Sequence, residues 1–467
     1  MHGRLILPAL RWRDDGGFDH EAETIAAALR FGAGGFIIFG GKPDAVRALT
    51  TELRDRAGRP LLIAADLERG AGQQFPGLTE FPPPAALAAL DDPEVIRAAA
   101  STTALDALDV GVNWVLAPDA DLDIEPANPI VQTRSFGSDP KLVGVAVALW
   151  VQACQQAGAL ACIKHFPGHG RTTRDSHDAV PSVEVDTATL EATDLVPFRM
   201  GVLAQAATVM TGHLRVPALD PTDTPATFSA AILRYLREEL GFSGLIVTDA
   251  LMMGAAVQDA ADLPAVRALA AGCDLLCYPA DPQAAHDAIG EALRTGALSE
   301  DRVEEALVRY GEALLRAQAG QTGGLAVGRS AVMADRLLAQ GLLRGTQPVV
   351  RLPVNLVIVD DDQDGAWPAS STEYVEMALR GAGVAVDRGG SKVVLAFAEP
   401  RASKGRAGFG PAALAALGRH GDADLVVVFG HPRLAAEVPG DAPLLLAWHR
   451  QRLMQEAVAR WLVGRLG

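Results

Sequence analysis

The stretch Lys164-His-Phe-Pro-Gly-His-Gly170 follows an apolar run at residues 159–163 and precedes Arg171-Thr-Thr-Arg-Asp175-Ser-His177. The apolar run predicts a buried strand, so a cation, imidazoles and a carboxylate should lie at one strand end and on its loop. Strand ends that open into glycine-broken loops are where α/β enzymes collect chemistry. Asp175 and His177 flank one serine, a spacing that lets a carboxylate orient an imidazole that moves protons.

Seven more short apolar runs resemble strands in the first two thirds of the chain, and most are separated by segments with helical periodicity. The eight predicted strands cover residues 4–7, 35–39, 61–66, 112–117, 159–164, 207–211, 245–249 and 274–278. Alternating strands and helices over about 320 residues favour a parallel α/β architecture, and eight repeats favour a (β/α)8 TIM-like barrel over an open sheet. We therefore predict a catalytic barrel over residues 1–328.

A glycine-rich break at residues 319–328 ends the predicted barrel. Residues 329–349 follow as a linker with one helix, and residues 350–467 show a second α/β pattern. Strand-like runs at 354–359, 392–397, 425–429 and 444–448, with a final amphipathic helix, predict a smaller α/β sandwich domain. The fold class is therefore a barrel followed by a sandwich.

Composition narrows the possible partners. Apolar residues make up 49% of the chain and charged residues 21%, as in a globular protein with a large core. The net charge of -16 argues against nucleic acid, whose phosphates need a basic face. The four cysteines lie in apolar segments without zinc spacing, which favours buried thiols. No apolar stretch approaches the roughly 20 residues of a membrane helix, and no targeting segment is visible, so we expect a cytoplasmic protein.

A second motif, Gly241-Phe-Ser-Gly-Leu-Ile-Val-Thr-Asp249, ends an apolar strand in a carboxylate. Asp249 would therefore stand at the barrel mouth on a rigid element. Cleavage of a glycoside with retention needs such a carboxylate on one side of the anomeric carbon and a proton donor on the other. The alternative for Asp249 is a helix N-cap after the strand. Asp66, Lys164, His165 and His213 also lie at or just past predicted strand ends.

Together these motifs resemble glycoside hydrolase family 3, in its bacterial β-N-acetylhexosaminidase branch. The resemblance rests on Lys-His-Phe-Pro-Gly-His-Gly-x4-Asp-Ser-His and on Gly-Phe-x-Gly-Leu-x-x-Thr-Asp, and it spans roughly residues 1–320. It implies Asp249 as the nucleophile and His177, oriented by Asp175, as the acid/base. No metal or organic cofactor is implied.

Further motifs extend the resemblance to the sugar-binding residues. Arg134-Ser-Phe-Gly137 matches the loop with the substrate arginine, Ala64-Ala-Asp66-Leu-Glu68 matches a segment that contacts sugar hydroxyls, and Val209-Met-Thr-Gly-His213 also matches. The resemblance implies that Asp66, Arg134, Lys164 and His165 hold the sugar and that His213 lines the floor. Gln74 stands where the family often has a second arginine, Arg69-Gly70 replaces a glycine pair, and Ala250 replaces an acid. These departures bear on substrate fine structure and turnover.

The sequence therefore predicts a retaining, exo-acting β-N-acetylhexosaminidase that releases terminal GlcNAc from cell-wall fragments such as muropeptides, or from related glycosides. The first alternative is a GlcNAc phosphorylase, because a histidine acid/base carries no fixed negative charge that would repel phosphate. The others are a β-glucosidase of the same family and a non-catalytic sugar-binding protein.

Overall fold

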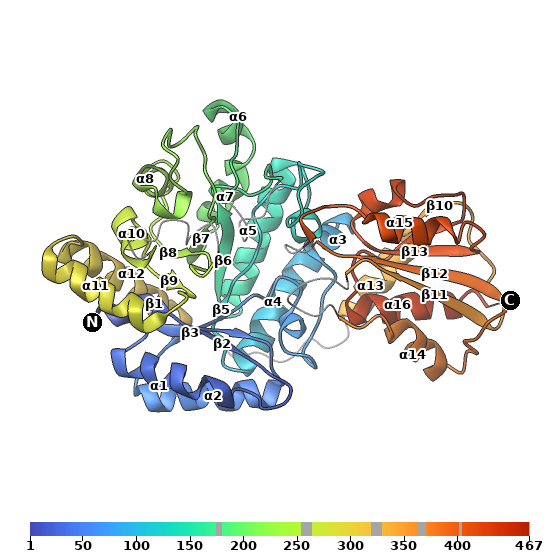
Figure 1. Cartoon of the computed structure of the whole chain (residues 1–467), viewed down its shortest axis with the longest axis horizontal. Helices are drawn as coiled ribbons and strands as arrows, with labels where there is room; N and C mark the ends of the chain where they lie inside the picture. Colours follow the sequence, from blue (N-terminus) through green and yellow to red (C-terminus); the bar gives the residue numbers. More distant parts are fainter. Residues whose placement is uncertain (174–179, 254–263, 319–328, 363–369, 401–403, 467) are drawn as a thin grey trace. The chain divides into compact units, whose positions relative to one another are not determined.

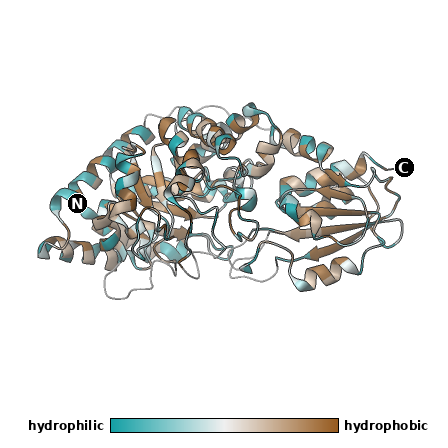
Figure 2. Ribbon diagram, turned by 90° about the horizontal axis from the view of Figure 1, so that it is seen from above, coloured by the Kyte–Doolittle hydropathy of each residue, from teal (hydrophilic) through white to brown (hydrophobic). Residues whose placement is uncertain are grey.

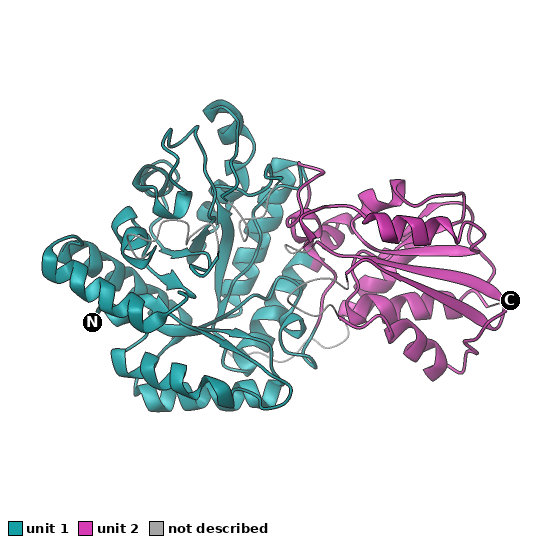
Figure 3. Ribbon diagram, in the orientation of Figure 1, with its two compact units in different colours: residues 1–79, 96–124, 138–326 teal, residues 80–95, 125–137, 327–467 magenta. Residues whose placement is uncertain are grey.

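The computed structural model describes residues 1–173, 180–253, 264–318, 329–362, 370–400 and 404–466. The chain forms two compact units, which Figure 3 distinguishes by colour. The first unit contains residues 1–79, 96–124 and 138–326, and the second contains residues 80–95, 125–137 and 327–467. The second unit is thus assembled from three separate stretches of sequence.

The first unit is a barrel of parallel strands (Figure 1). Its strands are β1 (Ile6–Leu7), β2 (Ala9–Arg11), β3 (Gly35–Phe39), β4 (Leu62–Ala65), β5 (Trp114–Val115), β6 (Leu160–Phe166), β7 (Thr208–Thr211), β8 (Leu245–Thr248) and β9 (Leu276–Cys277). Strands β2 to β8 form one sheet in chain order, and β1 pairs with β9. A bridge between Val247 and Leu275 joins β8 to the start of β9, while Pro8 alone separates β1 from β2. The ring is closed in this way.

Counting β1 and β2 as one interrupted strand gives the eight strands of the predicted barrel, so this prediction is confirmed. The strands are apolar because the barrel interior is packed with side chains. All seven residues of β6 are buried, including Lys164 and His165. Figure 2 shows the strands in the brown of hydrophobic residues, whereas many helices carry both colours.

Helices alternate with the strands, as the sequence predicts. They are α1 (Ala22–Phe31), α2 (Pro43–Ala57), α4 (Pro93–Asp109), α5 (Pro140–Gln156), α6 (Thr187–Ala192), α7 (Leu195–Leu203), α8 (Ala230–Glu238), α10 (Pro264–Ala271), α11 (Pro282–Thr295) and α12 (Glu300–Gln318). Asp139 caps the N-terminus of helix α5, because its carboxylate accepts hydrogen bonds from the Lys141 and Leu142 amides. Pro140 is the first residue of the helix, a position that suits proline. Its apolar face, which includes Val147 and Trp150, is buried.

The second unit is the predicted α/β sandwich. A five-stranded sheet has the order β10-β14-β13-β12-β11, in which only β10 is antiparallel. Its elements are α3 (Pro84–Ala89), α13 (Arg329–Gln340), β10 (Leu342–Arg344), β11 (Val354–Asp360), α14 (Tyr374–Gly381), β12 (Ser391–Ala398), α15 (Pro411–Gly418), β13 (Leu425–Gly430), β14 (Leu444–Leu446) and α16 (Arg452–Val463). Helices α13 and α14 both pack against α16.

The four cysteines are buried thiols, as the sequence predicts, and burial raises the pKa of Cys154, Cys162 and Cys273 to about 12. Among the described residues, no helix is long and apolar enough to cross a membrane.

A buried carboxylate ties the last strands of the barrel to its outer helices. Asp274 is fully buried and forms ion pairs with Arg237 of α8 (2.5 Å) and with two arginines of α12, Arg302 (2.7 Å) and Arg309 (3.1 Å). Its Oδ2 atom also accepts a hydrogen bond of 2.9 Å from the Ile246 amide of β8. Removing the charge of Asp274 would leave these three arginines without their carboxylate partner in a region that water hydrates poorly.

We therefore expect Asp274→Asn to lower the free energy of unfolding by about 3–5 kcal/mol, as for other buried pairs that lose one partner. Urea unfolding followed by circular dichroism measures the change. The exposed pair Glu291–Arg294 provides the control, because Glu291→Gln should leave the urea midpoint nearly unchanged. Equal midpoints for both variants would show that Asp274 is dispensable.

Candidate active site

The predicted site residues of the first unit lie where parallel strands end. Asp66 directly follows β4, Lys164 and His165 lie near the end of β6, His213 follows β7 by two residues, and Asp249 directly follows β8. Because all these strands are parallel and in one sheet, their carboxyl ends lie at the same end of the barrel. This is the end where (β/α)8 enzymes carry their active sites.

The Lys164 ammonium group is the positive centre of this region. Its Nζ atom donates to Asp66 Oδ1 (2.7 Å) and lies 2.8 Å from Glu68 Oε1 and 4.0 Å from Asp119 Oδ1. Lys164, Glu68 and Asp119 are buried, whereas 29% of the Asp66 side chain is exposed. Lys164 thereby fixes Asp66, and Asp66 is the carboxylate of this group that a ligand can reach.

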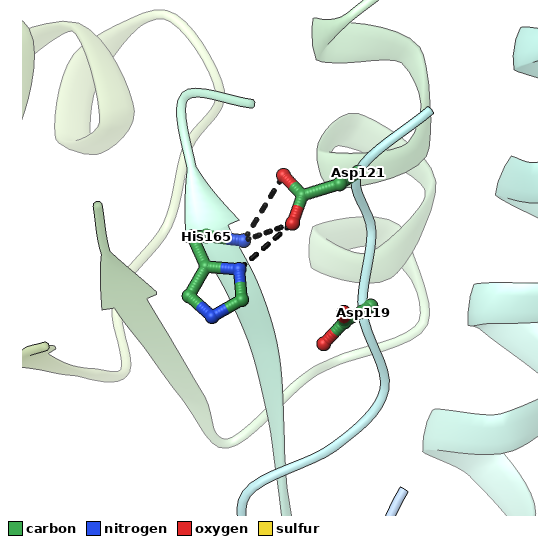
Figure 4. Close-up of side chains that lie close together, drawn as sticks. All are labelled: Asp119, Asp121 and His165. Carbon is green, nitrogen blue, oxygen red and sulfur yellow. Dashed lines mark hydrogen bonds and ion pairs between the residues drawn. The ribbon is translucent and has the colours of Figure 1, made fainter. Parts of the chain in front are cut away.

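The imidazole of His165 is held by a carboxylate that sequence reasoning missed. Asp121 Oδ2 lies 2.7 Å from His165 Nδ1, and both Asp121 oxygens lie 3.3 Å from the His165 amide nitrogen (Figure 4). Burial of Asp121 raises the pKa of its carboxyl, but the electrostatic interaction and hydrogen bond with His165 outweigh this effect, so that the pKa is lowered overall. Figure 4 shows the ring with Nδ1 toward Asp121 and the second nitrogen directed away from it.

His169 belongs to the same motif but differs in environment. Its amide donates a hydrogen bond of 2.6 Å to Asp121 Oδ1, and its Nδ1 contacts the hydroxyl of Thr172. Burial lowers the pKa of His169 to about 4, so the ring is neutral near pH 7. Gly170 packs so closely that an added Cβ would lie 2.2 Å from the carbonyl oxygen of Leu122, which explains the need for glycine at this position.

His213 is fully buried, and both of its ring nitrogens contact protein atoms. Nδ1 lies 2.8 Å from the Thr227 hydroxyl and Nε2 lies 3.1 Å from the Ala250 carbonyl oxygen. The ring therefore holds the backbone next to Asp249. The contact with sugar that the resemblance implies for His213 stays a prediction.

Asp249 is partly exposed and directly follows β8. Its amide donates to the Thr211 carbonyl at 3.2 Å, and its Oδ1 accepts a hydrogen bond of 2.7 Å from the Ala250 amide. Burial raises the pKa of Cys277, and the nearby negative charge of Asp249 adds to this rise. Burial lowers the pKa of His169, and the same charge opposes that fall. Asp249 thus lies near the Lys164 and His165 region, as a nucleophile beside a sugar site would.

The other predicted site residues are placed differently. Arg134 lies in a 3-10 helix, Gln132–Arg134, which belongs to the second unit, and its Nη1 donates to the Ile130 carbonyl at 3.3 Å. Asp175 and His177 lie outside the described residues. Their catalytic roles therefore stay predictions from the sequence.

Four site residues escaped the sequence analysis as functional groups, namely Glu68, Asp119, Asp121 and His169. The available signal was the alternation of carboxylates in Pro118-Asp-Ala-Asp-Leu-Asp123, just after a predicted strand. Alternate residues of an extended chain lie on one side, so this pattern places several acids at the same strand end.

Asp119, Asp121 and His165 also offer ligand atoms within 4.8 Å of one another. These distances would allow the three side chains to bind one metal ion. The hydrogen bond between His165 Nδ1 and Asp121 already accounts for two of its members, so the geometry does not require an ion.

Fold and site define a barrel enzyme with carboxylates, a lysine and imidazoles at its active-site end. The chain belongs to glycosyl hydrolase family 3, because the family's N terminal domain matches residues 24–312.

Individual relatives agree with this membership. A protein of Cellulomonas fimi named β-N-acetylglucosaminidase/β-glucosidase is 33% identical over 355 residues, which are 70% of this chain and 62% of that protein. A β-hexosaminidase of Alkalilimnicola ehrlichii is 38% identical over 293 residues, 60% of this chain and 82% of that protein. A solved family 3 β-N-acetylglucosaminidase from Paenibacillus sp. str. FPU-7 has a TM-score of 0.85 at 27% identity, covering 100% of this chain and 96% of that one.

The buried neutral ring of His169 predicts a pH dependence of stability. Its pKa falls from an ordinary 6.5 to about 4 on folding, so between these values the unfolded chain binds a proton that the folded chain does not. The contribution is complete above pH 6.5 and is lost as the pH falls toward 4, by on the order of 3 kcal/mol. Urea unfolding at pH 7 and pH 5 should show about 2 kcal/mol of this loss, because pH 5 is still above the folded-state pKa.

The variant His169→Gln should lose less stability than the wild type between the two pH values, because it has no ring to protonate. A wild-type pH dependence in His169→Gln would contradict the assignment.

Proposed function

We propose that this protein is a retaining, exo-acting β-N-acetylglucosaminidase. The observation that carries the proposal is the position of Asp249 at the end of β8, at the same end of the barrel as the Asp66–Lys164–His165 group. One carboxylate beside a polar, hydrogen-bonding group is what a glycosyl-enzyme intermediate requires. The names of the relatives support GlcNAc as the sugar.

In the proposed reaction Asp249 attacks the anomeric carbon and displaces the aglycone, forming a glycosyl-enzyme ester. Asp66 accepts hydrogen bonds from sugar hydroxyls, while Lys164 holds its carboxylate in place. His165 offers a ring nitrogen to the same sugar, and Arg134 is the proposed substrate arginine. Water then attacks the anomeric carbon and releases Asp249.

Proton transfer is assigned to His177, with Asp175 as its orienting carboxylate. The assignment rests on the Asp-Ser-His spacing. As imidazolium, His177 would protonate the departing oxygen, and as neutral imidazole it would then accept a proton from water. No metal or organic cofactor takes part in this scheme.

We place the substrate among GlcNAc-containing cell-wall fragments, including muropeptides, and the activity in the cytoplasm. Support for the compartment comes from the four cysteines, which are all buried and unpaired, as is common where thiols stay reduced. The net charge of -16 is unsuited to nucleic acid as a partner.

The sugar specificity has a direct test. Aryl β-GlcNAc should be cleaved far better than aryl β-glucoside or β-xyloside, which initial rates on the three substrates measure. The same rates with added phosphate separate water from phosphate as acceptor, because a phosphorylase would release GlcNAc 1-phosphate. Equal rates on GlcNAc and glucose would remove the specificity but leave the family membership intact.

The two proposed catalytic groups should fail differently. Asp249→Ala removes the nucleophile, and we expect a loss well above ~4 kcal/mol of barrier on every substrate. His177→Ala should lose about 10²–10⁴-fold on poor leaving groups and much less on nitrophenyl glycosides, which need little protonation. Azide should partly rescue the second variant, with β-azide as product. Equal impairment of His177→Ala on good and poor leaving groups would exclude the acid/base role.

A further inference from the structure

We propose that Asp121 is a positioning residue that acts through His165. It fixes the ring so that Nε2 is the atom presented to the sugar. The inference rests on the proposed function, because it assumes that His165 binds sugar. It adds a residue that neither the motifs nor the resemblance assign.

The hydrogen-bond geometry gives Asp121 a specific task. Its two oxygens receive three N–H groups, namely the His165 amide (3.3 Å), the His169 amide (2.6 Å) and, at 2.7 Å, the His165 Nδ1 position. A buried carboxylate can only accept hydrogen bonds when ionised, so Nδ1 must carry the proton. In the neutral ring, Nε2 is then the acceptor.

The backbone explains why Asp121 arrives at this place. Residues 118–121 run alongside β6, since the Ala120 amide donates to the Lys164 carbonyl at 2.6 Å and Asp119 bridges to Lys164. Side chains two residues apart in an extended segment lie on the same side. Asp119 and Asp121 therefore lie on the same side of this segment, where Asp119 Oδ1 is 4.0 Å from Lys164 Nζ and Asp121 Oδ2 is 2.7 Å from His165 Nδ1. Figure 4 shows both carboxylates on one segment beside the ring.

An amide could not replace the carboxylate at this position. Both oxygens of Asp121 face N–H donors, and asparagine would turn an NH2 group toward one of them. The ring would then lose either its Nδ1 partner or the backbone contact that holds the following loop. The negative charge of Asp121 also matters for its role, because further titratable groups lie in this region. Among the described residues of the first unit, Asp119 and His169 lie close to the Asp121–His165 pair, and Lys164 lies 4.0 Å from Asp119.

The first experiment reads the tautomer of His165 in the unmodified protein. Nitrogen-15 NMR of protein labelled at its ten histidines distinguishes a protonated from an unprotonated ring nitrogen, and His165→Ala identifies the signals. We expect a protonated Nδ1 at neutral pH, and we expect GlcNAc to shift Nε2 far more than Nδ1. An unprotonated Nδ1, or equal shifts of both nitrogens, would overturn the proposal.

The second experiment is a double-mutant cycle on sugar binding. Asp121→Asn should raise KM for aryl β-GlcNAc by roughly 10- to 100-fold, the scale of a hydrogen bond to a charged group, with a smaller change in kcat. In the His165→Ala background the same substitution should change KM little, because the residue it acts through is gone. The same KM increase in both backgrounds would show that Asp121 serves only the fold and would overturn the proposal.

A matched control is Asp106→Asn. Asp106 is another buried carboxylate of the first unit, and it accepts a hydrogen bond of 2.9 Å from the Thr79 amide, away from His165. Its effect on KM should be small and additive with His165→Ala. Coupling as large as that of Asp121 would also count against the proposal.

The outcomes separate this inference from the proposed function. A protein that cleaves no aryl β-GlcNAc would contradict the function, while the NMR measurement would still decide the tautomer. A protein that cleaves it with an unprotonated His165 Nδ1 would keep the function and reject the role of Asp121.

Discussion

The site depends on one buried interaction, the ammonium of Lys164 between the carboxylates of Asp66 and Glu68. The buried Lys164 ammonium and the buried Glu68 carboxylate need each other, because desolvating an ion costs several kcal/mol unless a close partner offsets the cost. This group of ion pairs joins the end of β6 to the residues after β4. In the sheet, β5 lies between these two strands. The Lys164 ammonium thereby fixes Asp66, the residue of the group that remains accessible.

The barrel architecture makes this interaction possible. Packed strand interiors favour apolar side chains, so charged side chains gather where several parallel strands end together. This explains why Asp66 and Asp249 directly follow apolar strands. Lys164 and His165 differ, because they lie within β6 and are buried. Their polar atoms need partners there, and the segment that follows β5 supplies Asp119 and Asp121.

Hydrophobic periodicity predicts this fold well because the packing of apolar side chains in the core determines where the strands and helices lie. All eight predicted strands overlap an observed strand, but residues 4–5 of the first prediction lie in a 3-10 helix, His2–Leu5, and β5 and β9 are only two residues long where six and five were predicted. The observed strands β5 and β9 are shorter than the apolar runs because a strand includes only residues that form backbone hydrogen bonds with a neighbouring strand. An apolar residue beside such a strand can be buried without forming them. Arg134 illustrates the limit of such reasoning, because it was counted with the barrel from its motif and neighbours yet belongs to the second unit. Contacts between distant segments decide such membership.

The candidate site was predicted only where a motif carried it. Asp66 and Asp249 directly follow strands, Lys164 and His165 lie near the end of β6, and all four were found. Asp121 precedes His165 by 44 residues, and the alternation of acids around it indicates a strand end but not its partner. A hydrogen bond between a loop and a strand depends on how neighbouring segments are aligned, which periodicity does not specify.

The carboxylates at the active-site end of the barrel differ in burial, and this difference indicates different roles. Glu68, Asp119 and Asp121 are buried against cations or N–H groups, while Asp66 and Asp249 are partly exposed. Groups that are buried and paired cannot rearrange cheaply, so they keep their partners oriented before a ligand arrives. Orientation fixed in advance is what makes polar groups effective toward developing charge. Under the proposed function, the buried acids would act on the sugar only through Lys164 and His165, and the partly exposed acids would act on it directly.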